Sequence, residues 1–364
     1  MNSAKIRLLA TITAVALLVS FCLVPSAFAA EATTDANAGE TSSVQTGTSV
    51  SDEYTKYLAS IADKSDAKED IVIGATDYKE TVGTDFEVIA EDGTVYKKDS
   101  VSEKLFDVLT DKVSGQKVSQ NCLNWADNNK FQQQGKVVYE VNVPADGIYN
   151  LAFTYFPLTK TGATDDNTDD KESTANVEIA VLIDGETLYA GLDGLKLPRN
   201  FVNSGATFEN PTGDVRTDSL GNQLTPEQVQ YADFVTYNAV DPVGVVADPY
   251  KIFLTAGTHT ITIESVYEPF ALASITLKAP QKEKTYDEYS AEHADAANYS
   301  GTALEIEGES AWIKSTNSLV SKADNSSSDI TPHDPIKTTL NFIGHTNWGT
   351  PGDTITWVVD VEEA

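Results

Sequence analysis

The sequence of 364 residues carries 55 acidic and 25 basic side chains, which gives a formal net charge of −30. A surface this negative repels nucleic acid and anionic lipid, so we expect neither as a partner. Of the two cysteines, Cys22 lies in a segment that we expect to be removed, which leaves Cys122 alone and excludes an intrachain disulfide.

The N-terminus has the organisation of an export signal. Lys5 and Arg7 form a short basic region, residues 8–24 are an apolar run, and residues 27–29 match the A-x-A pattern of a cleavage site. We therefore expect a signal peptide over residues 1–30 and a secreted, extracellular protein, free or associated with the cell surface. After cleavage we expect no membrane insertion. A membrane anchor is the alternative interpretation of the same run.

A polar linker and a short helix follow the signal. Residues 31–50 are small and polar and cannot bury enough apolar surface to offset ordering, so we expect a flexible linker. Ser51 is a suitable N-cap for the helix that begins next. Its apolar side chains recur at the spacing of one helix face, at Tyr54, Tyr57, Leu58 and Ile61.

Alternating apolar and polar residues then predict antiparallel strands. They cover residues 71–78, 137–143, 148–155 and 177–183. Residues 144–147 predict the turn between the second and third of these strands. The pair Asp184-Gly185 predicts a hairpin into residues 187–189.

The stretch of residues 248–277 predicts the last strands of the module. Residues 250–255 and 258–265 alternate in hydrophobicity and are joined by Ala256-Gly257, which predicts two half-buried antiparallel strands with a tight turn. A third strand is expected over residues 271–278. The preceding segment, residues 192–247, is loop-rich with four prolines, and such an insertion is typical of the end or face of a sandwich, where ligand surfaces are built.

An internal repeat divides the chain. Asp52-Glu53-Tyr54-Thr55 returns as Asp287-Glu288-Tyr289-Ser290, and Asn124-Trp125 with its following strand returns as Asn347-Trp348 with residues 354–361. We expect a helix plus a complete module over residues 51–283. A helix plus the front part of a second module is expected over residues 284–364.

The incomplete second copy poses a physical difficulty. Half a sandwich exposes unpaired strand edges and an apolar face, which is an aggregation hazard. Two explanations stay open at this point. The sequence is truncated, or the second module is completed by something outside this chain.

Three segments carry a resemblance to a known class of protein. They are VNVPADGIYNLAFTYFP, VLIDGETLYAG and PYKIFLTAGTHTITIESVYEPFALASITL. They resemble the galactose-binding-like β-sandwiches, a large class of carbohydrate-binding modules, as in the tandem amino-terminal regions of large secreted bacterial solute-binding proteins. The resemblance implies an all-β, antiparallel β-sandwich of jelly-roll type with short linking helices. It also implies a polysaccharide or oligosaccharide as the partner.

Carbohydrate modules stack an aromatic ring on a sugar and fix its hydroxyls with polar groups. On this basis Trp125 is the best single candidate, because Asp127 and Asn129 follow it closely. Tyr155 and Tyr237 are further candidates near loops or in the insertion. For each aromatic residue, packing in the core or the insertion is the alternative interpretation.

The resemblance also implies structural calcium, held near the first strand by a Glu-x-Glu pair. Only the second copy has this pair, as Glu307 and Glu309, and carboxylates are the ligands calcium prefers. We therefore expect calcium in the second module alone. The acidic run of residues 165–172 lacks the glycine and glutamate of a helix-loop-helix calcium site and is interpreted as a solvated loop.

Nothing in the sequence indicates an enzyme. The chain has no G-x-S-x-G, H-E-x-x-H or nucleotide-binding glycine motif, and its four histidines are scattered. We expect non-catalytic glycan binding, within a polysaccharide uptake or degradation system. The alternative is a structural or adhesive surface module that binds protein or spaces other domains.

Overall fold

The structure is a computed structural model. It describes residues 5–13, 50–82, 87–89, 94–97, 100–105, 122–124, 135–157, 175–231, 233–242, 244–246, 248–268, 270–295, 304–350 and 352–362. For residues 5–13, 50–51, 87–89, 94–97, 100–105, 122–124 and 362, the main chain alone is described. The candidates Trp125, Asp127 and Asn129 lie outside the described residues.

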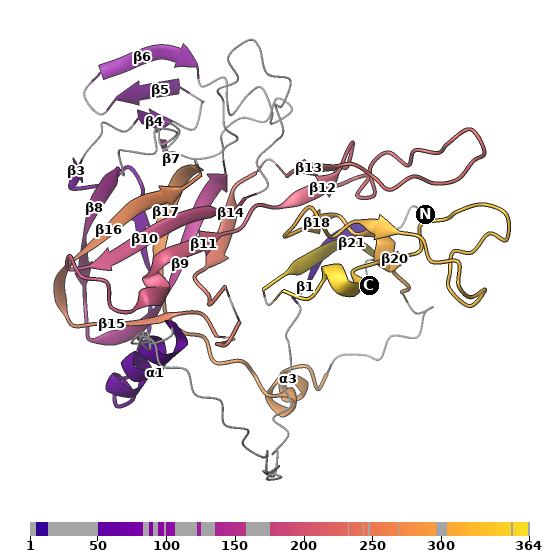
Figure 1. The fold of residues 1–364 in the computed structure, drawn as a ribbon. Coiled ribbons are helices and arrows are strands. Elements are labelled where there is room, and N and C mark those ends of the chain that lie inside the picture. The colour runs from indigo at the N-terminus through magenta and orange to yellow at the C-terminus, as the bar shows by residue number, and fades with distance from the viewer. Residues whose placement is uncertain are drawn as a thin grey trace, which may run out of the picture.

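The first module is an antiparallel β-sandwich, as predicted (Figure 1). One sheet has the order β11 (Asp193–Leu197), β10 (Val177–Ile183), β16 (Gly257–Tyr267), β8 (Lys136–Val143) and β3 (Glu80–Val82). The other has the order β14 (Val235–Asn238), β9 (Gly147–Pro157), β17 (Phe270–Lys278), β7 (Cys122–Asn124), β4 (Glu87–Ile89), β5 (Thr94–Lys97) and β6 (Ser100–Leu105). Two more strands join this second sheet, with β15 (Lys251–Leu254) beside β9 and β2 (Ile71–Gly74) beside β17.

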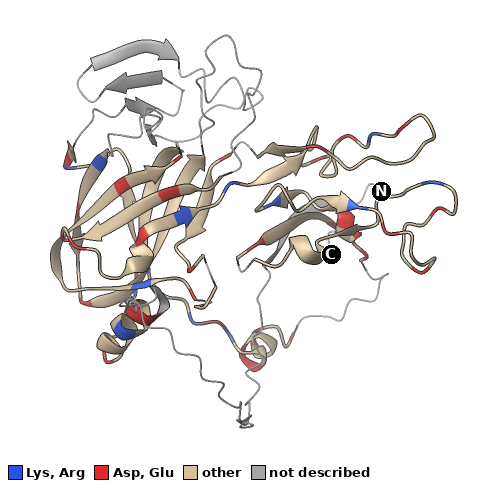
Figure 2. Ribbon diagram, in the orientation of Figure 1, with Lys and Arg blue, Asp and Glu red and all other residues tan. Residues whose placement is uncertain are grey.

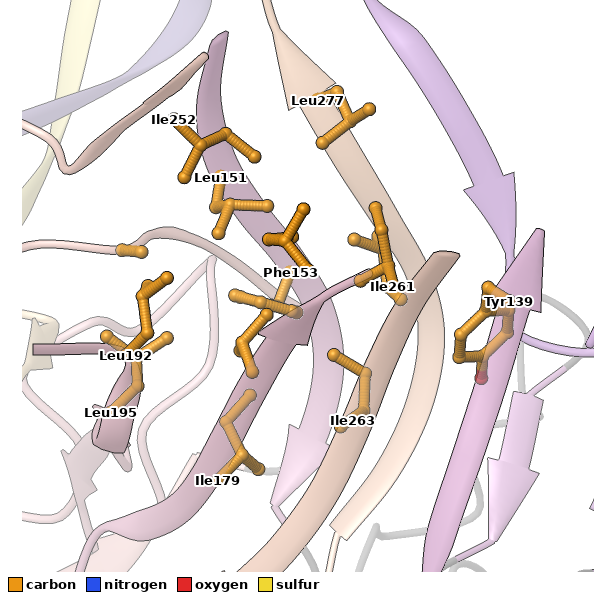
Figure 3. Close-up of a cluster of buried hydrophobic side chains, with 14 of the residues drawn as sticks. Tyr139, Leu151, Phe153, Ile179, Leu192, Leu195, Ile252, Ile261, Ile263 and Leu277 are labelled. Atoms are coloured by element: carbon orange, nitrogen blue, oxygen red, sulfur yellow. The ribbon is translucent and has the colours of Figure 1, made fainter. Parts of the chain in front are cut away.

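The inner faces of these sheets enclose one hydrophobic core (Figure 3). Tyr139 and Ile263 enter it from the sheet of β8 and β16, and Phe153 and Leu277 enter it from the sheet of β9 and β17. All four are completely buried. Each such side chain contributes about 1.5–3 kcal/mol by its removal from water, so the alternation read from the sequence is what holds the sandwich together.

The predicted hairpin of residues 250–265 is wrong in its pairing. Strand β15 pairs with β9, whereas β16 pairs with β8 and β10, so the turn between them crosses from one sheet to the other. Asp146 accepts a hydrogen bond from the Ala256 N–H at 2.7 Å, which ties this crossing to the turn between β8 and β9. Alternation specifies which face of a strand is buried but not which strand lies beside it, and this explains the error.

The predicted turn at Asp184-Gly185 forms, but the strand after it does not. Both residues have positive φ (52° and 84°), as a tight hairpin turn of this kind requires. Pairing stops after the single bridge between Ile183 and Glu186, and the chain enters the short helix η2 (Ala190–Leu192). Burial of Leu192 in the core favours this path of the chain over the continued hairpin that the sequence predicts.

Helix α1 (Val50–Ser60) packs along the outer edge of β15. The Tyr54 and Tyr57 hydroxyls accept hydrogen bonds from the backbone N–H groups of Lys251 (2.9 Å) and Phe253 (2.8 Å). The helix thereby satisfies donors that an edge strand leaves open. Its apolar stripe is the one predicted, with Tyr54 and Ile61 buried and Tyr57 and Leu58 partly buried against the core.

A further sheet combines the C-terminal segment with two strands of the insertion. Its order is β1 (Lys5–Thr13), β21 (Thr354–Glu362), β18 (Ile313–Lys314), β12 (Phe201–Asn203) and β13 (Gln228–Gln230). The smaller elements nearby are α3 (Tyr286–Glu292), η3 (Gly308–Ser310), β19 (Ser321–Lys322), β20 (Phe342–Ile343) and η4 (His345–Asn347). The insertion thus extends the sheet of the second module, and β1 falls inside the predicted signal peptide.

A buried ion pair fixes the base of the insertion. Arg199 Nη2 lies 3.1 Å from Glu268 Oε2, with both side chains almost completely buried. The guanidinium also donates to Gln230 Oε1 (2.8 Å) and to the Ala175 carbonyl (2.6 Å). These bonds join the start of the insertion, β13 and the end of β16.

No helix in the described part of the chain is long and apolar enough to cross a membrane.

Candidate functional site

A cleft of about 400 Å³ lies between the first module and the loops of the second. Its first wall consists of Ala175, Asn176, Lys196, Pro198, Tyr237 and Pro242, and its second of Ser315, Thr316, Ser318, Asn347, Thr350, Gly352 and Asp353. The volume is within the range of sites for small ligands, about 300–1,000 Å³. Tyr237 is the aromatic residue of this lining, and hydroxyl and amide side chains dominate the rest.

Tyr237 reaches the cleft from β14, which pairs with β9 through Tyr237 and Phe153. Burial raises the pKa of the Tyr237 hydroxyl to about 12, so the phenol is neutral and can donate a hydrogen bond. Within the described residues this hydroxyl has no hydrogen-bond partner. The ring is partly buried against the core of the first module, and its hydroxyl can exchange hydrogen bonds with a polar ligand such as a sugar.

The opposite wall presents hydroxyl and amide groups held by their own hydrogen bonds. Asn347 Nδ2 donates to the Ser318 carbonyl at 2.9 Å, and its amide oxygen accepts a hydrogen bond from the Thr346 hydroxyl at 3.4 Å. The Thr316 and Ser318 hydroxyls lie 3.3 Å apart. Groups positioned in this way can exchange hydrogen bonds with a polar ligand without much further ordering.

Among the described residues that line the cleft, Asp353 is the one carboxylate. Its Oδ1 accepts a hydrogen bond from the Ser315 hydroxyl (3.1 Å), and its carbonyl accepts one from Trp348 Nε1 (3.2 Å). Burial raises the pKa of the Asp353 carboxyl. The Trp348 ring is itself packed against the small core of Leu319, Ile355 and Trp357, so this wall rests on a hydrophobic base.

Figure 2 shows that acidic residues are spread along the ribbon of both modules. Among the described residues of the lining, the charged groups are Lys196 and Asp353, one on each wall. Lys196 Nζ lies 3.9 Å from Glu178 Oε1 in an exposed, weak ion pair. The described part of the lining thus carries one charge of each sign, which suits an uncharged ligand.

The structure separates the two tyrosine candidates by role. Tyr237 lines the cleft, whereas Tyr155 is completely buried in the core, where its ring is not available for stacking on a ligand. The Tyr155 hydroxyl donates to the carbonyl of Pro198, which lines the cleft. Tyr155 therefore holds the backbone of this part of the wall in place. Ser315, Ser318 and Asp353 were not singled out from the sequence, because polar loop residues carry no periodic signal.

Glu307 immediately precedes η3, and Glu309 lies within it. The carbonyls of this segment accept hydrogen bonds from Ser310 Oγ, Trp357 Nε1 and Ser321 Oγ. Burial, with a smaller contribution from the Glu307 charge, raises the pKa of Glu309. Within the described ranges no group of three or more Asp, Glu, His or Cys side chains is placed to hold a metal. This pair alone does not supply the six to eight oxygens that calcium takes, so the fit is incomplete.

No protein-family model and no curated protein matches the chain. Among solved structures, a β-(1,4)-mannanase of Podospora anserina with a family 35 module matches with 11% identity and a TM-score of 0.28, over 61% of this chain and 30% of that one. The C-terminal family 6 carbohydrate-binding module of a Zobellia galactanivorans laminarinase matches with 10% identity and a TM-score of 0.26, over 57% and 98%. A family 35 carbohydrate-binding module from Clostridium thermocellum matches with 12% identity and a TM-score of 0.24, over 58% and 100%. These identities and TM-scores are too low to transfer a ligand to this chain. Its ligand is therefore inferred from its own residues.

Proposed function

We propose that this protein binds a neutral oligosaccharide or polysaccharide in the cleft between its two modules. The observation that carries the proposal is the lining, which places one half-buried aromatic ring opposite hydroxyl and amide groups. Stacking on the ring and hydrogen bonds to fixed polar groups are the two components of sugar recognition. The sandwich fold and the resemblance of its strands to carbohydrate-binding modules support the same function.

We propose binding without catalysis, and the described part of the cleft lining fits this proposal. Glycoside hydrolysis by the common mechanisms uses two carboxyl groups on either side of the scissile bond, at about 5–9.5 Å. Within the described lining Asp353 has no second acid beside it, and the Ser315 hydroxyl donates to one of its oxygens. We further propose an extracellular role in polysaccharide uptake or degradation, with calcium at Glu307 and Glu309 if other ligands join them.

Affinity electrophoresis through gels that contain different plant and microbial polysaccharides tests the proposal. We expect at least one polysaccharide to retard the full chain and the Tyr237→Ala variant to lose that retardation. The matched control is Tyr286→Ala, which removes a tyrosine that is 81% exposed on α3, away from the cleft. Retardation that survives Tyr237→Ala, or that Tyr286→Ala also abolishes, would place the site elsewhere. Chelator in a parallel gel tests the calcium proposal separately.

A further inference from the structure

Strand β1 covers one whole edge of β21. The two strands lie side by side (Figure 1) and are antiparallel. Their register runs from Lys5 opposite Glu362 to Thr13 opposite Thr354. On its other edge β21 pairs with β18. The edge held by β1 is therefore a full-length strand-binding edge.

The first-module counterpart of β21 is β8. The strands read TITWVVDV and KVVYEVNV, with Trp357 at the position of Tyr139. Trp357 Nε1 donates to the Gly308 carbonyl at 3.0 Å, and the Tyr139 hydroxyl donates to the Ala75 carbonyl at 3.0 Å. Both aromatic side chains thus make the same hydrogen bond to the segment before the neighbouring strand.

The neighbours β18 and β3 confirm the correspondence of β21 with β8. Lys314 of β18 lies opposite Ile355, and Thr81 of β3 lies opposite Val137, which is the position equivalent to Ile355. Just before these strands, the Trp312 N–H donates to the Thr356 carbonyl at 2.8 Å. In the first module the Lys79 N–H donates to the Val138 carbonyl, also at 2.8 Å.

The other edge of β8 is occupied by β16, and β1 takes the equivalent place on β21. In the first module Ile261 lies opposite Tyr139, with register from Gly257 opposite Val143 to Glu264 opposite Lys136. Transferred to β21, this register gives the positions of residues 6–13, which are the ones that β1 fills. The N-terminal segment therefore occupies the place of a β16-type strand residue for residue.

Some residues of the second module are exposed although their counterparts in the first module are buried against β15 or β17. Tyr289 of α3 is 54% exposed, whereas its counterpart Tyr54 is buried against β15. Ile306 is 44% exposed, whereas its counterpart Ile73 is buried and pairs with β17 through Ile275. Within the described residues, the second module thus lacks the counterparts of all three closing strands.

We propose that the edge of β21 held by β1 is an acceptor site for an extended segment with the pattern of β16, in which Ile261 and Ile263 lie on one face and threonines on the other. The segment binds antiparallel, by backbone hydrogen bonds, with Ile263 or its equivalent opposite Ile355. Strand addition of this kind takes its affinity from the main chain and its specificity from the alternate side chains. Residues 5–13 fill the site in this structure.

Hydrogen exchange followed by mass spectrometry tests the acceptor site. Two chains are compared, residues 1–364 and residues 31–364, the second with and without a synthetic peptide of residues 255–266. We expect protection of β21 to fall about tenfold or more when residues 1–30 are absent, and the peptide to restore it. A peptide with Ile261→Pro, which lacks one ladder N–H, should fail. Strand β8 in the same samples is the internal control for folding.

A second variant tests the same edge of β21 without shortening the chain. In residues 1–364, Leu9→Pro interrupts β1 while the length of the chain is unchanged, and it should expose β21 in the same way. Equal protection of β21 in all chains would overturn the proposal. Equal rescue by both peptides would overturn it too, as would a dimer of residues 31–364 that protects β21 without any peptide.

Discussion

Lys314 is a cationic side chain in the core face of the second module. It is only 1% exposed, and its ammonium donates to Asn203 Oδ1 at 2.7 Å. Burial lowers the pKa of Lys314 to about 7. This folded value lies below the unfolded value of 10.5, so the unfolded chain binds more protons between these two pH values. Burial of the charge therefore lowers the free energy of unfolding by its full amount below pH 7, and this loss disappears as the pH rises towards 10.5.

Replacing Lys314 with methionine should therefore stabilise the protein at neutral pH. The variant removes a buried charge, and the Asn203 oxygen still accepts a hydrogen bond from Gln228 Nε2 at 2.8 Å. We expect a gain of about 1–3 kcal/mol at pH 6, shrinking as the pH approaches 10, measured by urea unfolding across that range. The control is Lys322→Met, on a partly exposed lysine of β19. A gain that does not vary with pH would contradict the assigned cause.

The Arg199–Glu268 pair and the Lys79–Glu140 pair differ in burial and so should differ in energy. The Arg199–Glu268 pair is buried. The Lys79–Glu140 pair, in which Nζ lies 2.6 Å from Oε2, is about half exposed. Glu268→Gln keeps the shape of the side chain but removes the carboxylate charge that faces the buried Arg199 guanidinium, at a cost of about 3–5 kcal/mol. Glu140→Gln should hardly move the urea midpoint. Equal midpoint shifts in the two variants would show that burial does not decide the effect.

At the scale of elements, α1 and β15 form one unit through two tyrosine hydroxyls. Tyr54→Phe or Tyr57→Phe leaves a backbone N–H of Lys251 or Phe253 without its acceptor, which costs about 1–3 kcal/mol. Urea unfolding measures the cost, and exchange of these two amides locates it. Tyr286→Phe, on an exposed tyrosine of α3, is the control and should have no effect. Unchanged exchange of both amides in the variants would refute the edge-capping role.

The elements predicted from the sequence are those whose residues face a core. The alternation in residues 137–143 and the stripe from Tyr54 to Ile61 reflect burial directly, and the structure has both. Strand partners were not predictable in the same way, as the crossing between β15 and β16 shows. Pairing is decided by contacts between distant segments, which local periodicity does not encode.

At the scale of the whole molecule, the insertion joins the modules through β12 beside β18. This contact brings loops of the second module against Tyr237 and so creates the cleft. From the sequence, the insertion is predicted to be a ligand region and Tyr237 a candidate, and both stay predictions. Asp353 and Ser318, which are far away in the sequence, could not be assigned to the same site, because only the packing of the two modules brings them there.

Isothermal titration of a retarding oligosaccharide into the full chain tests the shared cleft most directly. The variants are Tyr237→Ala on the first wall and Asn347→Ala on the second, with Tyr286→Ala as the control. The account predicts that each wall variant weakens binding about tenfold or more while the control binds normally. Normal binding by both wall variants would contradict a glycan site between the modules.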